Sequence, residues 1–398
     1  KEIIGNESQE RMGLVIHPKN LELLHKIADR ERSPMYEVGK VTDDFRFTFK
    51  SDKEEKSPMD FDLADMFGSS PHTFMRDINL YRNYKKVDYT QDDMYNYVSQ
   101  VLQLEAVACK DWLTNKVDRC VGGKVAKQQC VGALQLPLND VGVMAMDYKG
   151  VKGIATSIGH APASALIDEK AGSRNSIAEA LTNIIWAPLE DSLKSVSLSA
   201  NWMWPCKNEG EDARLYNAVE AVSKFAIDLG INVPTGKDSL SMKQKYANEE
   251  VISPGTVIIS AAGQCSDIKK VVEPVLKNTE NNRIYYIDLS KDDFKLGGSS
   301  FAQIRNKIGE ETPTINDTTY FKDVFDTIQK FIKNDLIIAG HDISAGGIIT
   351  TLLEMCFAEN NLGARIDLSG LDEEDAVKVL LAENSGIIFH SNNPTEIE

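Results

Sequence analysis

The stretch LIIAGHDISAGGIITTLLEMCFA, residues 336–358, combines polar side chains with a change of secondary structure. Its first apolar residues predict a buried strand over 336–338, and the later ones recur at helical spacing. Asp342 and Ser344 fall between the two, where the free N–H groups and positive dipole end of a helix favour phosphate. A structural role, with Ser344 capping the helix and Asp342 closing the turn, is the alternative.

Gly346 and Gly347 follow in the predicted first turn of the helix. Each costs roughly 1 kcal/mol relative to alanine in a helix. Their presence therefore favours the close approach of another group to the backbone. His341, which begins the polar stretch, is expected to be a core or hydrogen-bonded histidine rather than a ligand.

Two other segments offer oxygen atoms of the kind that Mg²⁺ prefers. In SIAEALTN, Glu179 and Asn183 lie four residues apart, so they point from the same side of a predicted helix. Most of their neighbours are apolar, and a carboxylate among them needs a partner, although a solvated helix face would also explain the pair. In QLPLNDVGVMAM, Asn139 and Asp140 stand between two strand-like runs, a position typical of metal ligands and equally of turns.

Several familiar catalytic patterns are absent from the sequence. PTGKDSLSM, residues 234–242, is not a P-loop, because Ile231 stands where the pattern GxxxxGK[ST] requires glycine and Asp238 follows the lysine. HExxH, GxSxG and zinc-type Cys/His clusters do not occur. None of the six cysteines forms a CxxC pair, which indicates reduced thiols and a cytoplasmic protein.

The composition, 42% hydrophobic and 26% charged over 398 residues, is that of an ordinary globular protein. The net charge of −16 argues against binding nucleic acid through a broad basic face. A nucleotide held through a metal is compatible with this charge, since cations bridge carboxylates to phosphates. No run of 18 apolar residues predicts a membrane span, so no membrane partner is expected.

The segments that must position these residues alternate between helix and strand patterns, which predicts a mixed α/β fold. The clearest helix lies over 213–229 and ends at Gly230. Residues 51–95 lack clear elements and predict a linker that wraps the surface. GLVIHPKN (13–20) and GIIFHSNN (386–393) resemble each other, as expected if the parent protein is duplicated and this chain spans about one repeat.

Six segments, taken in order, resemble phosphoribosylformylglycinamidine (FGAM) synthases of the large, single-chain type. They are NESQERM (6–12), EALTNI (179–184), LSANWM (198–203), GEDARLYNAVEAVS (210–223), GKDSLSMK (236–243) and HDISAGGIITTLLEMCFA (341–358). The resemblance implies an α/β (α+β) fold with aminoimidazole ribonucleotide synthetase-like N-terminal and C-terminal domains. The implied domains are the tail of a preceding C-terminal domain (1–50), the wrapping linker (51–95), an N-terminal domain of ATP-binding type (96–270) and a truncated C-terminal domain (271–398).

The resemblance also implies a function and a site. FGAM synthases convert formylglycinamide ribonucleotide, ATP and glutamine to FGAM in purine biosynthesis. In the large type, the second half resembles a former active site that retains ADP with Mg²⁺ in a structural role. The matching residues here are Asp140, Glu179, Asn183 and Asp342 for the metal, and Lys110, Asn139 and Ser344 for the nucleotide. Four oxygen ligands plus a diphosphate favour more than one Mg²⁺.

No catalytic residue is expected in this segment, because the resemblance implies that catalysis belongs to the first synthetase-like half and a glutaminase domain. Those missing domains are the expected partners, and a homodimer is the alternative for the isolated chain. We therefore expect the chain alone to make no FGAM. Two other interpretations stay open: a self-contained ATP-dependent enzyme of the aminoimidazole ribonucleotide synthetase type, and a scaffold without a ligand.

Overall fold

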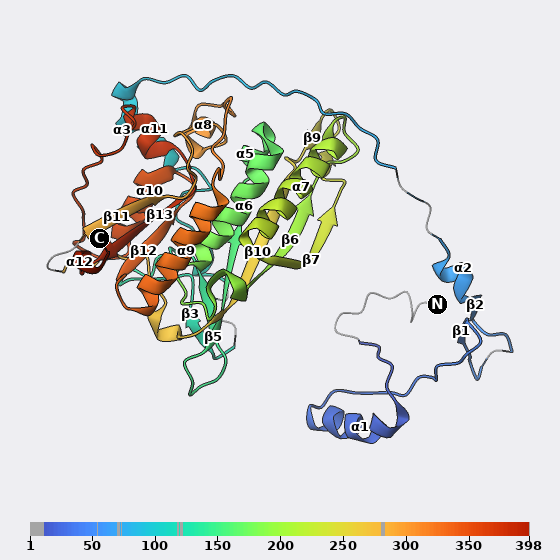
Figure 1. Ribbon diagram of the computed structural model, residues 1–398. Helices are drawn as coiled ribbons and strands as arrows, with labels where there is room; N and C mark the ends of the chain where they lie inside the picture. The colour runs from blue at the N-terminus through green and yellow to red at the C-terminus, as the bar shows by residue number, and fades with distance from the viewer. Residues whose placement is uncertain are drawn as a thin grey trace. The chain divides into compact units, whose positions relative to one another are not determined.

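The computed structural model describes residues 12–53, 55–69, 72, 74–117, 119, 122–279 and 283–397. The chain divides into two compact units, Lys1–Met75 and Arg76–Glu398 (Figure 1). Of the segment NESQERM, only Met12 lies among the described residues. The units are taken in turn below, and the second contains all the predicted site residues.

The first unit consists of short elements with little buried surface. They are a 3₁₀ turn η1 (Pro18–Asn20), helix α1 (Leu21–Arg30), strands β1 (Arg46–Phe49) and β2 (Met59–Asp62), and helix α2 (Leu63–Phe67). The two strands form an antiparallel hairpin in which Arg46 pairs with Asp60 and Asp62. The first copy of the repeated segment forms no strand here, and its Val15 is 82% exposed.

A six-stranded sheet is the centre of the second unit, in the order β3-β4-β5-β10-β6-β7. Its strands are β3 (Val125–Lys127), β4 (Gly142–Ala145), β5 (Gly153–Gly159), β6 (Val196–Met203), β7 (Asn232–Ser239) and β10 (Thr256–Cys265). All neighbours pair antiparallel except β6 and β7, which are parallel. A small hairpin of β8 (Lys243–Lys245) and β9 (Glu250–Ile252) follows β7.

Helices cover one face of this sheet and leave the other open. Figure 1 shows α5 (Pro162–Ile167), α6 (Glu169–Ile184) and α7 (Glu211–Leu229) in front of the strands. Residues of β5 are alternately buried and exposed, as expected for a strand with one covered face. Ile154 and Ile158 of β5 point to the open face and are 42% and 59% exposed. The predicted helix over 213–229 is α7, and Gly230 ends it with a left-handed φ of 76°.

A second sheet, in the order β11-β13-β12, carries the C-terminal part of the unit. Its strands are β11 (Arg283–Asp288), β12 (Ala339–Ile343) and β13 (Gly386–Ser391). Helix α9 (Thr318–Lys333) packs on one face, where the ring centroids of Phe331 and Phe389 lie 6.5 Å apart. Helix α10 (Gly347–Phe357) packs on the other face, where Leu352 and Ile388 share a small core cluster. The second copy of the repeated segment is therefore the buried central strand β13.

The predicted strand over 336–338 lies slightly further along the chain. Leu336 and Ile337 are buried, at 9% and 6% exposure, but the ladder with β13 begins at Ala339. An apolar run predicts that residues are buried but not that they pair with another strand. These residues are buried in the segment that leads into the strand. The shift places His341 and Asp342 inside β12 instead of after it.

The chain ahead of the large sheet lies along the second unit. From Arg76 onward it runs past α7 to a group of short helices, namely η2 (Gln91–Asp93), α3 (Met94–Val101), α8 (Ser300–Ile304) and α11 (Ala376–Leu381), and α4 (Asp111–Thr114) follows in the chain. Tyr97 of α3 packs edge-on against Phe301 of α8 at 5.1 Å between ring centroids. The remaining short elements are η3 (Ser192–Ser195), η4 (Ile268–Lys270) and α12 (Pro394–Ile397).

Candidate metal and nucleotide site

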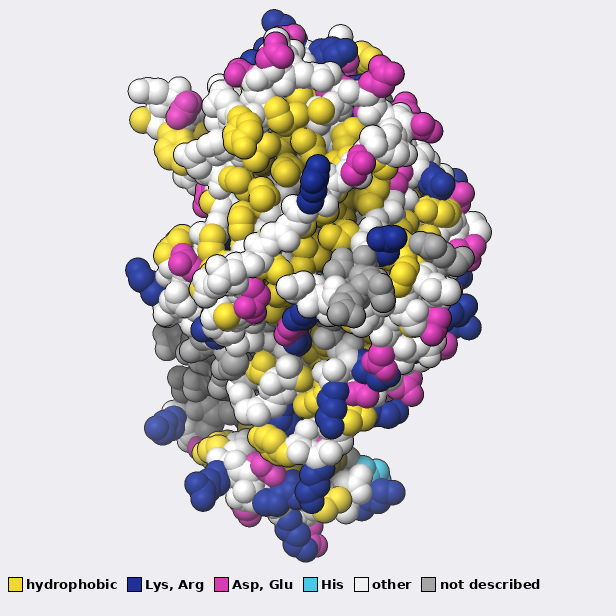
Figure 2. Space-filling model, turned by 90° about the vertical axis from the view of Figure 1, so that its left-hand side faces the viewer, with side chains coloured by type: hydrophobic (Ala, Val, Ile, Leu, Met, Phe, Trp, Pro, Cys, Tyr) yellow, Lys and Arg dark blue, Asp and Glu magenta, His cyan; other side chains and the backbone are white. Residues whose placement is uncertain are grey.

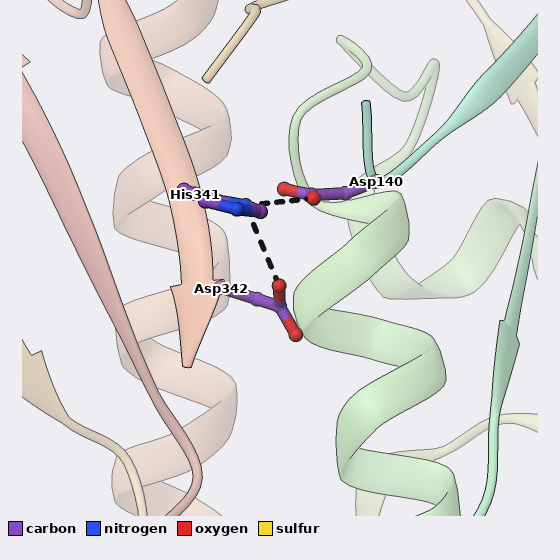
Figure 3. Close-up of side chains that lie close together, drawn as sticks. All are labelled: Asp140, His341 and Asp342. Carbon is purple, nitrogen blue, oxygen red and sulfur yellow. Dashed lines mark ion pairs between the residues drawn. The ribbon is translucent and has the colours of Figure 1, made fainter. Parts of the chain in front are cut away.

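Three ionisable side chains from distant parts of the sequence meet between the two sheets. Asp140 precedes β4, and His341 and Asp342 are consecutive residues of β12 (Figure 3). His341 Nδ1 lies 2.8 Å from Asp140 Oδ1 and 3.6 Å from Asp342 Oδ1. All three side chains are at most 8% exposed. We refer to Asp140, His341 and Asp342 as the acidic cluster.

Consecutive residues of β12 both contribute to the cluster, although successive side chains of a strand point to opposite faces. His341 shares its face with Ala339 and Ile343, which pack against α10. In Figure 3 the side chains of both His341 and Asp342 extend from β12 toward Asp140 and helix α6. Asp140, at the start of β4, faces both. The cluster is thus built where β12, α6 and the edge of the large sheet converge.

The turn after β12 depends on its glycines. Gly346 and Gly347 adopt left-handed φ values of 94° and 72°. A Cβ on Gly347 would lie 2.7 Å from the Leu380 carbonyl oxygen. Thr351 Oγ1 donates a hydrogen bond to the Asp342 carbonyl at 2.9 Å, which fixes the strand end to the first turn of α10. Gly347 therefore allows the turn to pack against the C-terminal end of α11, and Gly346 leaves room for the Thr350 side chain, in addition to any ligand.

The electrostatics of the cluster favour a bound cation. Burial raises the pKa of Asp342 well above its ordinary value, and the nearby Asp140 carboxylate raises it further. Burial likewise raises the pKa of Asp140, although His341 acts in the opposite sense. Burial lowers the pKa of His341, but Asp140 and Glu354 outweigh it and hold that pKa well above its usual range. Buried carboxylates this close are stable as anions only with compensating positive charge.

Orphaned polar atoms test whether these residues fit a metal. Asp140 Oδ2 and Asp342 Oδ2 are buried without a hydrogen-bond partner, and His341 Nδ1 lies beside both carboxylates. Buried polar atoms in folded proteins are nearly always paired, so an unpaired set that converges on one point indicates a missing ligand. The ligand atoms of the three residues lie within 4.8 Å of one another. The donor set therefore fits a divalent cation.

Glu179 and Asn183, the predicted pair on one helix, lie on α6 as expected. Glu179 Oε2 accepts the His160 backbone N–H at 2.7 Å, and its charge contributes to the raised pKa of Asp342. The side chain of Asn183 donates to the Ile158 carbonyl at 3.0 Å. Glu179 therefore lies beside the acidic cluster, whereas the amide nitrogen of Asn183 is engaged with β5.

The three residues assigned to the nucleotide differ in their surroundings. Ser344 is half-buried in the turn between β12 and α10. Asn139 donates through Nδ2 to the Gln128 carbonyl at 2.7 Å, and its buried Oδ1 has no partner. Lys110 donates to the Ala108 carbonyl at 2.8 Å rather than to a carboxylate of the cluster. Asn139 and Ser344 thus adjoin Asp140 and Asp342 in the chain, and Lys110 belongs to a separate segment.

Sequence reasoning missed two carboxylates that support the site. Glu354 of α10 lies 3.1 Å from His341 Nε2. Glu383 accepts the backbone N–H groups of Gly346 at 2.7 Å and Ser300 at 2.8 Å, so it joins the turns before α10 and α8. The signal for Glu354 was a single acidic residue on an otherwise apolar helix, which by itself does not indicate its partner.

A cavity of about 600 Å³ lies on the open face of the large sheet and extends to Asp140. Small side chains form much of its lining, including Thr156, Ser199 and Ser260.

None of the helices in the described part of the chain combines the length and hydrophobicity that a membrane crossing needs. Figure 2 shows Lys, Arg, Asp and Glu side chains interspersed on one face, beside a broad hydrophobic area.

Comparisons with known proteins identify both parts of the second unit. Residues 109–264 match the FGAR-AT PurM_N-like domain family, and residues 280–396 match the C-terminal domain of AIR synthase related proteins. Phosphoribosylformylglycinamidine synthase of Homo sapiens is 38% identical over 99% of this chain. Probable phosphoribosylformylglycinamidine synthases of Arabidopsis thaliana, named as chloroplastic/mitochondrial, and of Caenorhabditis elegans are 38% and 36% identical over 98% and 100% of it.

The chain spans 28–31% of the length of these three relatives. Among solved structures, Thermotoga maritima PurL complexed with ATP is similar, with a TM-score of 0.56 and 15% identity. The match covers 98% of this chain and 53% of that one. The complex of the same protein with ADP gives a TM-score of 0.55 at 15% identity, over 96% of this chain and 52% of that one. The expected synthetase-like fold is confirmed.

Proposed function

We propose that this chain carries an auxiliary nucleotide and Mg²⁺ site of a phosphoribosylformylglycinamidine synthase. The chain belongs to that family and corresponds to about 30% of the length of its curated members. The parent activity is the ATP- and glutamine-dependent conversion of formylglycinamide ribonucleotide to FGAM. The site is structural, and the chain alone is inactive.

The observation that carries the proposal is the set of orphaned atoms in the acidic cluster. Asp140 Oδ2 and Asp342 Oδ2 are buried without partners at the place where the family resemblance assigns metal ligands. Asp140, Glu179, Asn183 and Asp342 would hold Mg²⁺, which supplies the positive charge that bridges carboxylates to phosphates. Ser344 and the N–H groups at the start of α10 would face the phosphates, and Lys110 and Asn139 the remainder of the nucleotide.

We propose further that the other parts of the enzyme cover the open face of the large sheet. The exposed Ile154 and Ile158 and the adjoining cavity support this, because an open apolar sheet face normally packs against another layer. Residues 1–50 would close the preceding synthetase-like domain. The exposure of Val15, whose counterpart in the second copy lies in the buried strand β13, supports that assignment.

Nucleotide analysis and thermal unfolding test the proposed site. The purified full chain is denatured, and the supernatant is analysed chromatographically for ADP or ATP. Stripped protein is then melted with and without ADP and Mg²⁺. We expect about 4 kcal/mol of stabilisation at a thousandfold excess over Kd, and loss of this effect in Asp342→Ala. A nucleotide-free preparation whose melting is unchanged by ADP and Mg²⁺ contradicts the proposal.

Enzymatic assays test the proposed inactivity. The chain is incubated with ATP, formylglycinamide ribonucleotide and ammonia, and both FGAM and ADP are measured over time. We expect neither product above the level of the Asp342→Ala variant. Sustained ATP hydrolysis that requires Asp342 would favour a self-contained ATP-dependent enzyme instead. FGAM formation would show that the first synthetase-like half is dispensable.

A further inference from the structure

We propose that His341 is itself a ligand of the cation at this site, binding through Nδ1, and that Glu354 holds its ring in place through Nε2. The inference rests on the proposed function, which assigns a cation to Asp140 and Asp342 but uses oxygen ligands alone. It adds one nitrogen ligand to the site. It therefore implies a preference among divalent cations that an oxygen-only site would not have.

The spacing of the ligand atoms suits a shared cation. His341 Nδ1 is 2.8 Å from Asp140 Oδ1 and 3.6 Å from Asp342 Oδ1. Adjacent ligands of a six-coordinate cation with bonds of roughly 2.1 Å lie about 3 Å apart. Nδ1 thus lies beside both carboxylates, and Asp140 is the nearer of the two. Two buried carboxylate oxygens without partners, one from each aspartate, belong to the same small cluster as this nitrogen.

Glu354 completes a pattern common to metal-binding histidines. Its Oε2 lies 3.1 Å from His341 Nε2. Histidines that ligate metals usually donate the other ring N–H to a carboxylate, which fixes the tautomer and the ring orientation. With Nε2–H donated to Glu354, the lone pair of Nδ1 is directed to the cluster.

A simple ion pair between protonated His341 and Asp140 is the competing arrangement, and the two differ in which cations they favour. Two carboxylates and one imidazole favour Co²⁺ or Zn²⁺ over Mg²⁺, which prefers oxygen. We expect the nucleotide-free chain to bind Co²⁺ at least tenfold more tightly than Mg²⁺. His341→Gln should remove most of this preference. If His341 had only a structural role, the substitution would weaken the binding of both cations by the same factor.

Pulsed electron paramagnetic resonance of the Mn²⁺-loaded full chain tests the ligand directly. Coupling of the Mn²⁺ electron spin to ¹⁴N is expected in the unmodified protein and should be absent in His341→Gln. Glu354→Gln can still accept the Nε2–H, so the coupling should persist there and weaken in Glu354→Leu. His160→Asn is the matched control, because His160 adjoins the site through Glu179 and offers another nitrogen. Its coupling should be unchanged.

The outcomes separate this inference from the proposed function. Mn²⁺ that binds without ¹⁴N coupling overturns the role of His341 and leaves the oxygen site intact. Coupling that disappears in His160→Asn but persists in His341→Gln overturns it as well. If folded protein binds neither Mn²⁺ nor Mg²⁺, both this inference and the proposed function are contradicted. If His341→Gln does not fold, equal coupling in Glu354→Gln and Glu354→Leu still refutes the proposed positioning by Glu354.

Discussion

At the scale of single residues, Asp342 is the most constrained group of the site. Its carboxylate is 3% exposed and lies beside Asp140 and Glu179, which raise its pKa together with burial. Removing that charge should help the metal-free chain, as active-site charges often cost stability. We predict that Asp342→Asn stabilises the metal-free chain by roughly 1–2 kcal/mol.

Denaturant unfolding in the presence of a chelator measures this prediction. The same variant should lose the stabilisation by ADP with Mg²⁺, so the two effects have opposite signs. Asp342→Ala serves as a comparison, because it removes the same charge but also leaves a cavity that lowers stability. If Asp342→Asn is clearly less stable than the unmodified chain without metal, the carboxylate is already neutralised within the protein and the cluster needs no cation.

His390 provides a residue-scale test in a different part of the fold. It is buried in β13, and burial, with a smaller contribution from Lys277, lowers its pKa below 6.5. The folded state therefore resists protonation at pH values where the unfolded chain accepts a proton. The stability that this group contributes is present above about pH 6.5 and is lost as the pH falls toward the lower folded pKa.

We predict that His390→Asn flattens the loss of stability between pH 7 and 5, measured by denaturant unfolding at each pH. Asparagine can still accept the Lys277 N–H that His390 Nδ1 accepts. His25→Gln, at an exposed position, should leave the slope unchanged. An unaltered slope in His390→Asn would assign the acid sensitivity to other groups.

The sequence indicated the ligand types better than their partners. Asp140 and Asp342 could be proposed as metal ligands because they match the site that the family resemblance implies. The roles of His341 and Glu354 could not, because their contact depends on α10 packing on the face of β12 that His341 occupies. A hydrogen-bonded His341 was expected, and its bond to Glu354 agrees, but no pattern in the sequence identifies the carboxylate.

At the scale of elements, the segment after Arg76 is attached to α7 by charge rather than by aromatic packing. The Arg82 guanidinium pairs with Glu211, which is 4% exposed and also pairs with Arg214. Asp77 accepts the Asp212 backbone N–H at 3.1 Å, close to the start of the helix. Tyr81 in this linker is 93% exposed, whereas Tyr89 packs edge-on against Phe301 of α8 at 5.4 Å between ring centroids.

We predict that Arg82→Met destabilises the chain by roughly 1–3 kcal/mol, because Glu211 then remains buried with one fewer cation. The value is below that for a fully buried pair, since Arg82 is 30% exposed. Lys85→Met, at an exposed position in the same segment, should change stability by no more than about 0.5 kcal/mol. Equal effects of the two substitutions in denaturant unfolding would contradict the attachment.

Strongly periodic elements such as α7 and α9 could be predicted because their apolar stripes match the face they bury. The start of β12 could not, since Leu336 and Ile337 are buried without joining the ladder. GLVIHPKN is the converse case, in which a strand-like pattern does not form a strand. Its pattern matches that of β13, but a central strand also needs neighbours on both sides, and the described part of the first unit offers none.

At the scale of the whole molecule, the open sheet face predicts self-association of the isolated chain. We expect sedimentation velocity to show a dimer that Ile154→Glu converts to a monomer, because a charge on this face opposes its burial. Ile227→Glu is the matched control on the outer side of α7, where Ile227 is 73% exposed. A monomer at all concentrations, or a dimer lost equally in both variants, would contradict this prediction.

The central claim, that a nucleotide and Mg²⁺ bind at the acidic cluster, is tested most directly by calorimetric titration. Nucleotide-stripped full chain is titrated with ADP in the presence and absence of Mg²⁺, and the titration is repeated on Asp342→Ala. The account predicts tight binding that requires Mg²⁺ and is lost in the variant. The absence of binding in folded protein, or binding that survives Asp342→Ala, would contradict it.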